Sequence, residues 1–164
     1  MFSTDLYDEE KFLKQEFEDL DISSLGLEDL ISEIISTRID EVKVCLGCDA
    51  PLASIFLIGS TLEGILLGIA FLNQNKYCQA SSAPKYQGHV KSFKRWTLND
   101  FIEVSYEIGF LKEDVYKFSH VLRNFRNYIH PFKQMSLRFN PDKHTAKICW
   151  QVLNAAIHQL SVSQ

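Results

Sequence analysis

One segment of this 164-residue chain restricts the fold more than any other: residues Pro51–Leu72 carry a single charged side chain, Glu63. A stretch this long and apolar can cross a membrane or lie at the centre of a folded domain. A carboxylate near the middle is costly in lipid, and Ser60, Thr61 and three glycines also interrupt the apolar surface. We therefore expect a buried central helix of a bundle and no association with a membrane.

The rest of the chain also has apolar residues at helical spacing. Glycine and proline are scarce, with seven and four copies. We predict an all-α fold, a four-helix bundle with one additional short helix. We expect a single domain over residues 25–164, a helical and acidic N-terminal extension over 1–24, and a long loop over 73–96. Apolar side chains recur every three or four positions in four further segments, as in amphipathic helices: 27–48, 98–108, 112–130 and 141–160.

The strongest candidate for chemistry is the segment 122–131, which places two Arg-Asn pairs before a histidine. The pairs are Arg123 with Asn124 and Arg126 with Asn127, and the histidine is His130. On one continuous helix, Arg123 and His130 project within about 20° of each other, because each residue turns the helix by about 100°. Asn127 falls beside them and Arg126 on the other flank. We expect this polar group at the edge of the buried face, half-desolvated or facing a partner.

This segment resembles the HEPN superfamily, small helical bundles in which an arginine precedes a histidine by four to six intervening residues. Arg123, with six residues before His130, fits that spacing, whereas Arg126 has only three. Segments 58–64, 96–102 and 108–111 also resemble parts of HEPN-type bundles. The resemblance therefore extends over much of the chain from residue 50 to residue 160.

The resemblance implies a metal-independent RNA endonuclease of toxin or phage-defence type that acts as a homodimer, with an antitoxin or another protein as a further partner. Arg123 and His130 would be catalytic: arginine binds phosphate oxygens, and histidine moves the proton of the attacking 2′-hydroxyl. Asn124, Arg126 and Asn127 would orient the histidine or donate to phosphate. Two alternatives stay open. One is a module that binds RNA, a nucleotide or a protein without cleavage, and the other is a polar seam that only holds helices or subunits together.

We expect Glu63 to have a charged or hydrogen-bonding partner, because a carboxylate among leucines is costly to bury unless it is paired. Arg123, Arg126 and His130 are the natural candidates, and we expect a structural pair more than a catalytic one. His120 lies further round the surface and is interpreted as an exposed residue, in preference to a second base.

Small residues repeat every four positions along the apolar segment, at Ser60, Gly64 and Gly68. Small side chains at this spacing let a second helix approach closely. We expect that approach either within the bundle or across a dimer.

Cysteines and the chain start bear on cofactors and location. Cys45 and Cys48 form a C-x-x-C pair, but a structural zinc site needs four ligands, and only the separate Cys78 and Cys149 remain. We expect reduced, largely buried thiols at a helix end, and no metal or other cofactor. The first ten residues are polar and acidic, unlike a secretory signal, so we expect a cytoplasmic protein.

The net charge of −4 hides two unequal halves. Residues 1–84 carry 15 acidic and 5 basic side chains, a net charge of −10, whereas residues 85–164 carry 6 acidic and 12 basic ones, a net charge of +6. The candidate site lies in the basic half. A basic surface attracts phosphate, although the two halves of one bundle can also neutralise each other.

Overall fold

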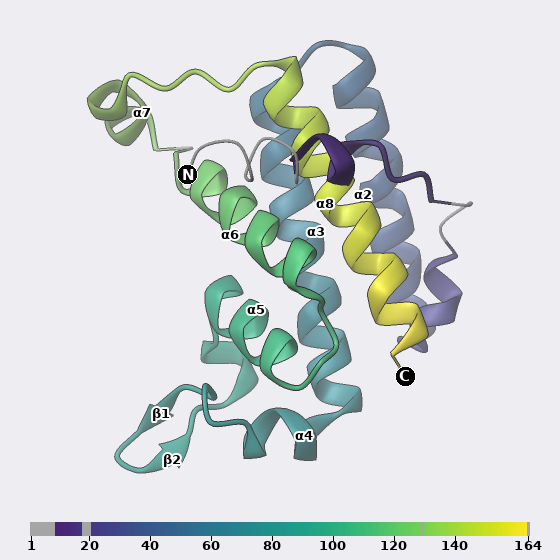
Figure 1. The fold of residues 1–164 in the computed structure, drawn as a ribbon, viewed down its shortest axis with the longest axis vertical. Helices are drawn as coiled ribbons and strands as arrows, with labels where there is room; N and C mark the ends of the chain where they lie inside the picture. The colour runs from purple at the N-terminus through teal and green to yellow at the C-terminus, as the bar shows by residue number, and fades with distance from the viewer. Residues whose placement is uncertain (1–8, 18–20, 129, 164) are drawn as a thin grey trace.

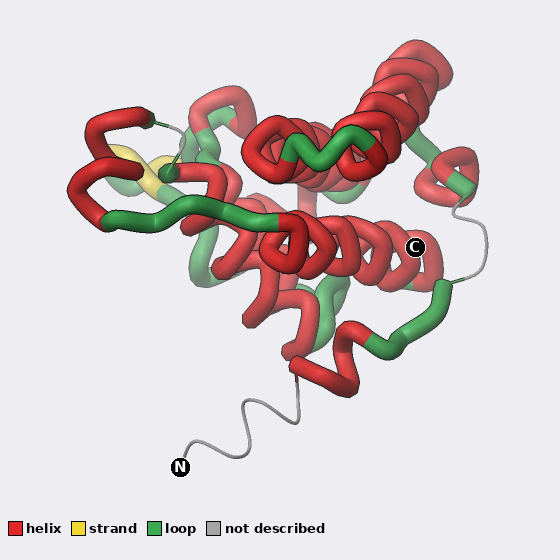
Figure 2. The backbone as a smooth tube through the Cα atoms, turned by 90° about the horizontal axis from the view of Figure 1, so that it is seen from above, coloured by secondary structure: helices red, strands yellow, loops and turns green. Residues whose placement is uncertain are grey.

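The computed structural model describes residues 9–17, 21–128 and 130–163, and most of these residues are helical. The prediction of an all-α helical bundle is confirmed. Figures 1 and 2 show the arrangement in two views at right angles. The helices are η1 (Ile22–Leu25), α2 (Asp29–Gly47), α3 (Pro51–Leu72), α4 (Gln74–Gln79), η2 (Phe93–Arg95), α5 (Leu98–Glu107), α6 (Glu113–Asn127), α7 (Pro131–Leu137) and α8 (Lys143–Val162).

Helix α3 is the central element, in contact with α2, α5, α6 and α8 (Figure 1). It begins at Pro51, where proline costs no helical hydrogen bond. Its residues Ile55, Ile58 and Leu62 are fully buried, and burial of each such side chain stabilises the fold by about 1.5–3 kcal/mol. Among the described residues, α3 is the one helix long and apolar enough to cross a membrane, and half of its most apolar stretch is covered by neighbours. The predicted buried central helix is confirmed.

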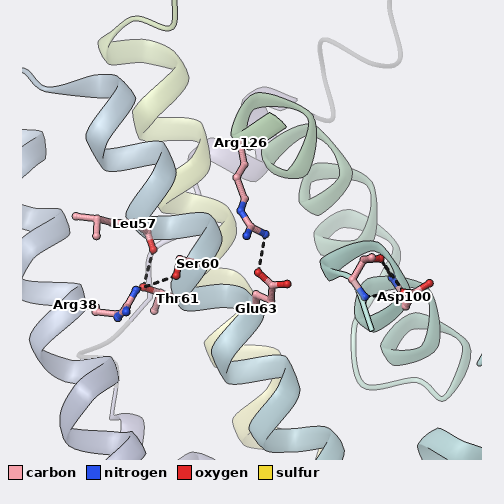
Figure 3. Close-up of polar contacts among 8 residues, drawn as sticks. Arg38, Leu57, Ser60, Thr61, Glu63, Asp100 and Arg126 are labelled. Carbon is pink, nitrogen blue, oxygen red and sulfur yellow. Dashed lines mark hydrogen bonds and ion pairs between the residues drawn. The ribbon is translucent and has the colours of Figure 1, made fainter. Parts of the chain in front are cut away.

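The row of small residues on α3 is used within the chain at two of its three positions. The Ser60 hydroxyl accepts a hydrogen bond from Arg38 Nη1 of α2 at 2.9 Å (Figure 3). A Cβ atom on Gly68 would lie only 2.7 Å from a methyl carbon of Leu27, whereas one on Gly64 would meet nothing within 4 Å. Gly68 thus leaves room for the side chain of Leu27 between η1 and α2, and Ser60 joins α3 to α2 by a hydrogen bond. The close approach of a second helix stays a prediction.

Helix α5 starts and ends as the sequence predicts. Thr97 caps it: the Thr97 hydroxyl accepts from the Asp100 backbone N–H at 3.3 Å, and the Asp100 carboxylate accepts from the Thr97 backbone N–H at 2.7 Å. This reciprocal pair satisfies two donors that a helix start leaves free. Gly109 follows the helix with a φ of +79°, a conformation that glycine adopts without strain.

The predicted long loop over residues 73–96 is wrong in part, because the segment has structure of its own. After α4 comes a hairpin of β1 (Lys85–Tyr86) and β2 (His89–Val90), and then η2. Gln87 and Gly88 form its two-residue turn, both with positive φ, as tight hairpin turns of this type require.

Burial explains why this segment is ordered. Tyr77 is fully buried, and its hydroxyl forms a hydrogen bond of 2.8 Å with Ser105 of α5. Burial raises the pKa of Tyr77 to about 12. The Glu107 carboxylate at the end of α5 accepts hydrogen bonds from the backbone and hydroxyl groups of both Ser81 and Ser82, at 2.5 to 2.8 Å. These four bonds lower the pKa of Glu107 to about 2. Such contacts join residues distant in sequence, so local patterns did not reveal them.

The predicted single helix over residues 112–130 is also wrong at its end. Helix α6 stops at Asn127, and Pro131 starts the separate helix α7 in place of only stopping α6. A residue before proline is disfavoured in the helical region, and His130 has extended backbone angles there. Helix α7 also occupies part of the loop expected over residues 135–140, and it lies apart from the main bundle (Figures 1 and 2).

The described part of the N-terminal extension packs on the bundle. Phe12 is 2% exposed and stacks on Phe118 of α6, with ring centroids 4.4 Å apart. Gln151 of α8 donates to the backbone carbonyls of Phe12 and Gln15 at 3.1 and 2.7 Å. Residues 1–8 and 18–20 of the predicted extension lie outside the described residues.

Candidate functional site

Helix α6 carries the two motif arginines, and it directs them to different neighbours. Arg126 reaches α3, whereas Arg123 reaches α5. Both side chains are half-buried. The two arginines are three positions apart, an offset of about 60° around the helix, and each contacts the neighbouring helix nearest to it.

Arg126 forms an ion pair with Glu63 of α3. Arg126 Nη1 lies 2.7 Å from Glu63 Oε2, and each side chain is 29% exposed (Figure 3). The stem of the arginine crosses α3 at Gly59, where an added Cβ would come within 2.9 Å of Arg126 Cδ. The expectation that Glu63 pairs with one of three candidates is confirmed, and the partner is Arg126. This pair neutralises both charges at the helix contact.

Arg123 is held in a different way. Its Nη1 donates to the side-chain carbonyl of Asn99 on α5, and its Nη2 donates to that of Asn124 at 3.1 Å. Both acceptors are neutral amides. Within the described parts of the chain, no carboxylate lies within ion-pair distance of Arg123, and its buried Nε has no hydrogen-bond partner. Arg123 therefore has no direct ion-pair partner among the described residues.

His130 lies on neither flank of α6. It occupies the position before α7, its side chain is exposed, and its ring lies 6.0 Å from that of Phe132. Its backbone carbonyl accepts from the Gln134 N–H at 3.0 Å. The expectation that Arg123 and His130 share one face of one helix is wrong, because the two residues belong to different elements. Asn127, the last residue of α6, is exposed like His130.

The structure brings a different histidine next to Arg123. His120 Nε2 lies 3.2 Å from Glu103 Oε1, and Tyr116 donates its hydroxyl proton to Glu103 Oε2 at 3.0 Å. The side chain of His120 is only 23% exposed, so its interpretation as an exposed surface residue is wrong. Burial is the main cause that lowers the pKa of His120. Arg123 lowers it further and Glu103 opposes the shift.

The C-x-x-C pair lies away from this region, at the end of α2. Cys45 is half-buried and Cys48 is exposed, so the expectation of largely buried thiols fails for Cys48. In the part of the chain that the structure describes, no three histidine, cysteine or acidic side chains form a cluster suited to a metal ion.

Comparison with known proteins adds no relative. Neither family models, nor curated protein sequences, nor solved structures contain a match to this chain.

Proposed function

We propose that this protein is a HEPN-like, metal-independent RNA endonuclease of toxin or phage-defence type. The observation that supports this most directly is that, among the described residues, no carboxylate pairs directly with Arg123. Its guanidinium is fixed by two neutral amides and lies in the basic half of the chain. A guanidinium held in place without a carboxylate is suited to a phosphate group.

In the proposed reaction, Arg123 binds the scissile phosphodiester, and a histidine takes the proton of the attacking 2′-hydroxyl. The charge of Arg123 offsets the negative charge that builds on the phosphate oxygens in the transition state. His130 is the histidine that the HEPN resemblance favours. Its exposure makes it accessible to a large substrate, with Asn124 and Asn127 close in sequence to support it.

The protein is proposed to work in the cytoplasm as a homodimer, so that two motifs serve one cleft. Support for an association surface comes from α7, which exposes Phe132, Met135 and Leu137 at 71%, 68% and 52%. Exposed apolar side chains close together are typical of interaction sites. A toxin of this type is also expected to have a neutralising protein partner, such as an antitoxin.

A specific observation also favours a second function, RNA or nucleotide binding without cleavage. Within the described residues, no hydrogen bond holds the His130 ring. A general base must be held within hydrogen-bond reach of the proton that it accepts. If Arg123 binds phosphate but no histidine is held next to the substrate, the protein binds RNA or a nucleotide without cleaving it.

The deciding experiment is cleavage of a pool of single-stranded and structured RNA in the presence of EDTA. The wild type is compared with His130→Ala, and His89→Ala is the matched control because His89 is an exposed histidine of the β2 strand. EDTA-resistant cutting by the wild type and the control, lost in His130→Ala, establishes the nuclease with His130 as a catalytic residue. RNA binding without any cutting by folded wild type establishes the binding module instead.

A further inference from the structure

We propose that His120 and Arg123 together form a phosphodiester site on the α5–α6 surface, in which Arg123 binds the phosphate and His120 accepts the proton of the 2′-hydroxyl. The inference rests on the proposed nuclease function and replaces His130 as the proton acceptor. Helices α5 and α6 carry both residues and their partners.

Helices α5 and α6 meet in three successive polar or aromatic contacts. Asn99 contacts Arg123, Glu103 contacts His120, and Tyr106 stacks on Tyr116 with ring centroids 4.1 Å apart. The numbers rise along α5 while they fall along α6, at the three- and four-residue spacing of neighbouring side chains on a helix surface. This register places the imidazole of His120 one turn from the guanidinium of Arg123, on the same flank of α6.

Glu103 fixes the chemical state of His120. A carboxylate only accepts hydrogen bonds, and Glu103 Oε1 lies 3.2 Å from His120 Nε2, so we expect the neutral ring to carry its proton on Nε2. In the neutral ring, the other nitrogen, Nδ1, then has a free lone pair. Tyr116 holds the same carboxylate from its other oxygen and meets the His120 ring edge to face, with centroids 4.7 Å apart. The imidazole is thus oriented by two neighbours and keeps one nitrogen available as a base.

Burial favours the neutral imidazole of His120. Burial and the nearby Arg123 lower the pKa of His120, and Glu103 partly opposes them. A neutral base next to an arginine without a direct ion-pair partner is the combination that phosphodiester cleavage requires, because one group takes a proton while the other faces the developing negative charge. His130 has no comparable support among the described residues.

The reaction balances without a metal. His120 Nδ1 accepts the proton of the 2′-hydroxyl, and the 2′-oxygen forms a bond to phosphorus as the bond from phosphorus to the 5′-oxygen breaks. The products are a 2′,3′-cyclic phosphate and a free 5′-hydroxyl. The leaving oxygen takes a proton from solvent, and the imidazolium returns its proton to solvent.

The first test needs no cleavage. Wild-type protein is titrated with inorganic phosphate, and separately with a short RNA that carries a non-cleavable 2′-methoxy group, while NMR follows the histidine ring signals. The His120 signals are identified by their proximity to the Tyr116 ring. We expect saturable shifts of His120 with both probes, and displacement of phosphate by the RNA. Absence of shifts at His120 with either probe overturns the site, as does phosphate binding that the RNA does not displace.

The second test compares RNA cleavage by His120→Gln, His130→Gln and the control His89→Gln, each checked for wild-type thermal unfolding. We expect His120→Gln to lose about 100-fold or more in rate, as for removal of a general base. We also expect the fall in rate at low pH to disappear, because that fall comes from protonation of His120. Loss confined to His130→Gln overturns the inference and keeps the proposed nuclease. A wild type that cuts no RNA refutes the nuclease, and the phosphate titration then still decides whether the His120 and Arg123 site exists.

If His120→Gln does not fold, Tyr116→Phe serves as the second variant. It removes the hydroxyl contact to Glu103 and keeps the stacked ring. We expect a smaller loss of rate and a shifted pH profile, which a merely structural role of the tyrosine would not produce. An unchanged pH profile in this variant contradicts the positioning of His120 by Glu103.

Discussion

Two arginines lie three residues apart on α6, and each is followed by an asparagine. Within the described chain, one forms an ion pair and the other does not. Arg126 meets a carboxylate, Glu63, at the contact with α3. Arg123 meets two amide oxygens at the contact with α5. The first arginine completes the packing of the bundle and loses its net charge, whereas the second is fixed in place and keeps it. Both arginines are followed by an asparagine, so the next residue in sequence does not distinguish them. The side chain that each arginine contacts decides whether its charge is available to a ligand.

The difference follows from what surrounds each flank. Helix α3 is nearly all apolar, so a lone carboxylate or guanidinium at its surface is costly and the pair compensates both. The α5 flank is more polar, with Asn99, Glu103 and Tyr106 in succession, and an arginine there is tolerated without a direct ion pair. Helix α6 therefore has one flank that packs on α3, the structural flank, and one flank at α5 that is suited to binding a ligand.

The largest expected effect concerns catalysis. Arg123→Lys keeps the charge but removes the planar fork that binds two phosphate oxygens. We expect a loss of about 100-fold or more in the rate of RNA cleavage. The matched control is the double variant Glu63→Leu with Arg126→Met, which removes the other arginine without leaving its partner charged, and we expect it to cleave near the wild-type rate. The reverse ranking would make Arg126 the phosphate ligand and end the distinction between the flanks.

The next effect concerns stability. Glu63→Ala leaves Arg126 without its counter-charge in a half-buried position. We expect the free energy of unfolding to fall by about 2 kcal/mol, because a partly buried charge loses its partner. The double variant should recover most of this loss, since both charges are then gone. Urea unfolding of the single and double variants measures this, and an equally large loss in the double variant would mean that shape, not charge, matters at this contact.

Local sequence patterns predicted the helices well where a pattern is compatible with only one structure. The apolar density from Pro51 to Leu72 identified α3 to the residue at both ends, and the helix predicted over residues 98–108 matches α5 within one residue. Pro131 carries two meanings, because proline both ends a helix before it and starts one after it. The interpretation as a stop alone extended α6 to His130 and hid α7.

The candidate site depends on partners that the sequence alone does not pair. The need of Glu63 for a counter-charge was visible, but the choice of Arg126 depends on Gly59, whose missing side chain gives the arginine room. Likewise, His120 and Arg123 are neighbours on any helix at three-residue spacing. Their alignment with Glu103 and Asn99 is set by the register between α5 and α6, which depends on the whole core.

Two glycines on α3 lie in different surroundings, one against the Arg126 side chain and one facing open space. A Cβ at position 59 would meet Arg126 Cδ at 2.9 Å, whereas one at position 64 would meet nothing within 4 Å. We expect Gly59→Ala to lower the free energy of unfolding by about 1 kcal/mol through displacement of the arginine stem. Gly64→Ala should raise it by about 0.5–1 kcal/mol, because alanine is the better helix former. Thermal unfolding of both variants tests this, and equal effects would show that Arg126 does not rely on the gap.

The smallest expected effect is a pH dependence that belongs to the binding flank alone. The pKa of His120 is lowered by burial and by Arg123, and Glu103 opposes the shift. Arg123→Gln should therefore raise this pKa and Glu103→Gln should lower it, as measured by NMR titration of the ring signals. The hydrogen bond to Glu103 raises the pKa of Tyr116, which also contacts this carboxylate.

The same shift makes a small contribution to folding. A histidine whose pKa is lower in the folded protein binds protons more readily when unfolded, so its contribution to stability is fully present above about pH 6.5 and is lost as the pH falls through that value toward the folded pKa. We expect His120→Gln to weaken the fall in unfolding free energy across this window, and His89→Gln to leave it unchanged. Urea unfolding at several pH values makes the comparison. An identical pH dependence in His120→Gln and the wild type would mean that the imidazole is equally solvated in both states, and the α5–α6 flank would then lack the partly desolvated base on which the His120 proposal depends.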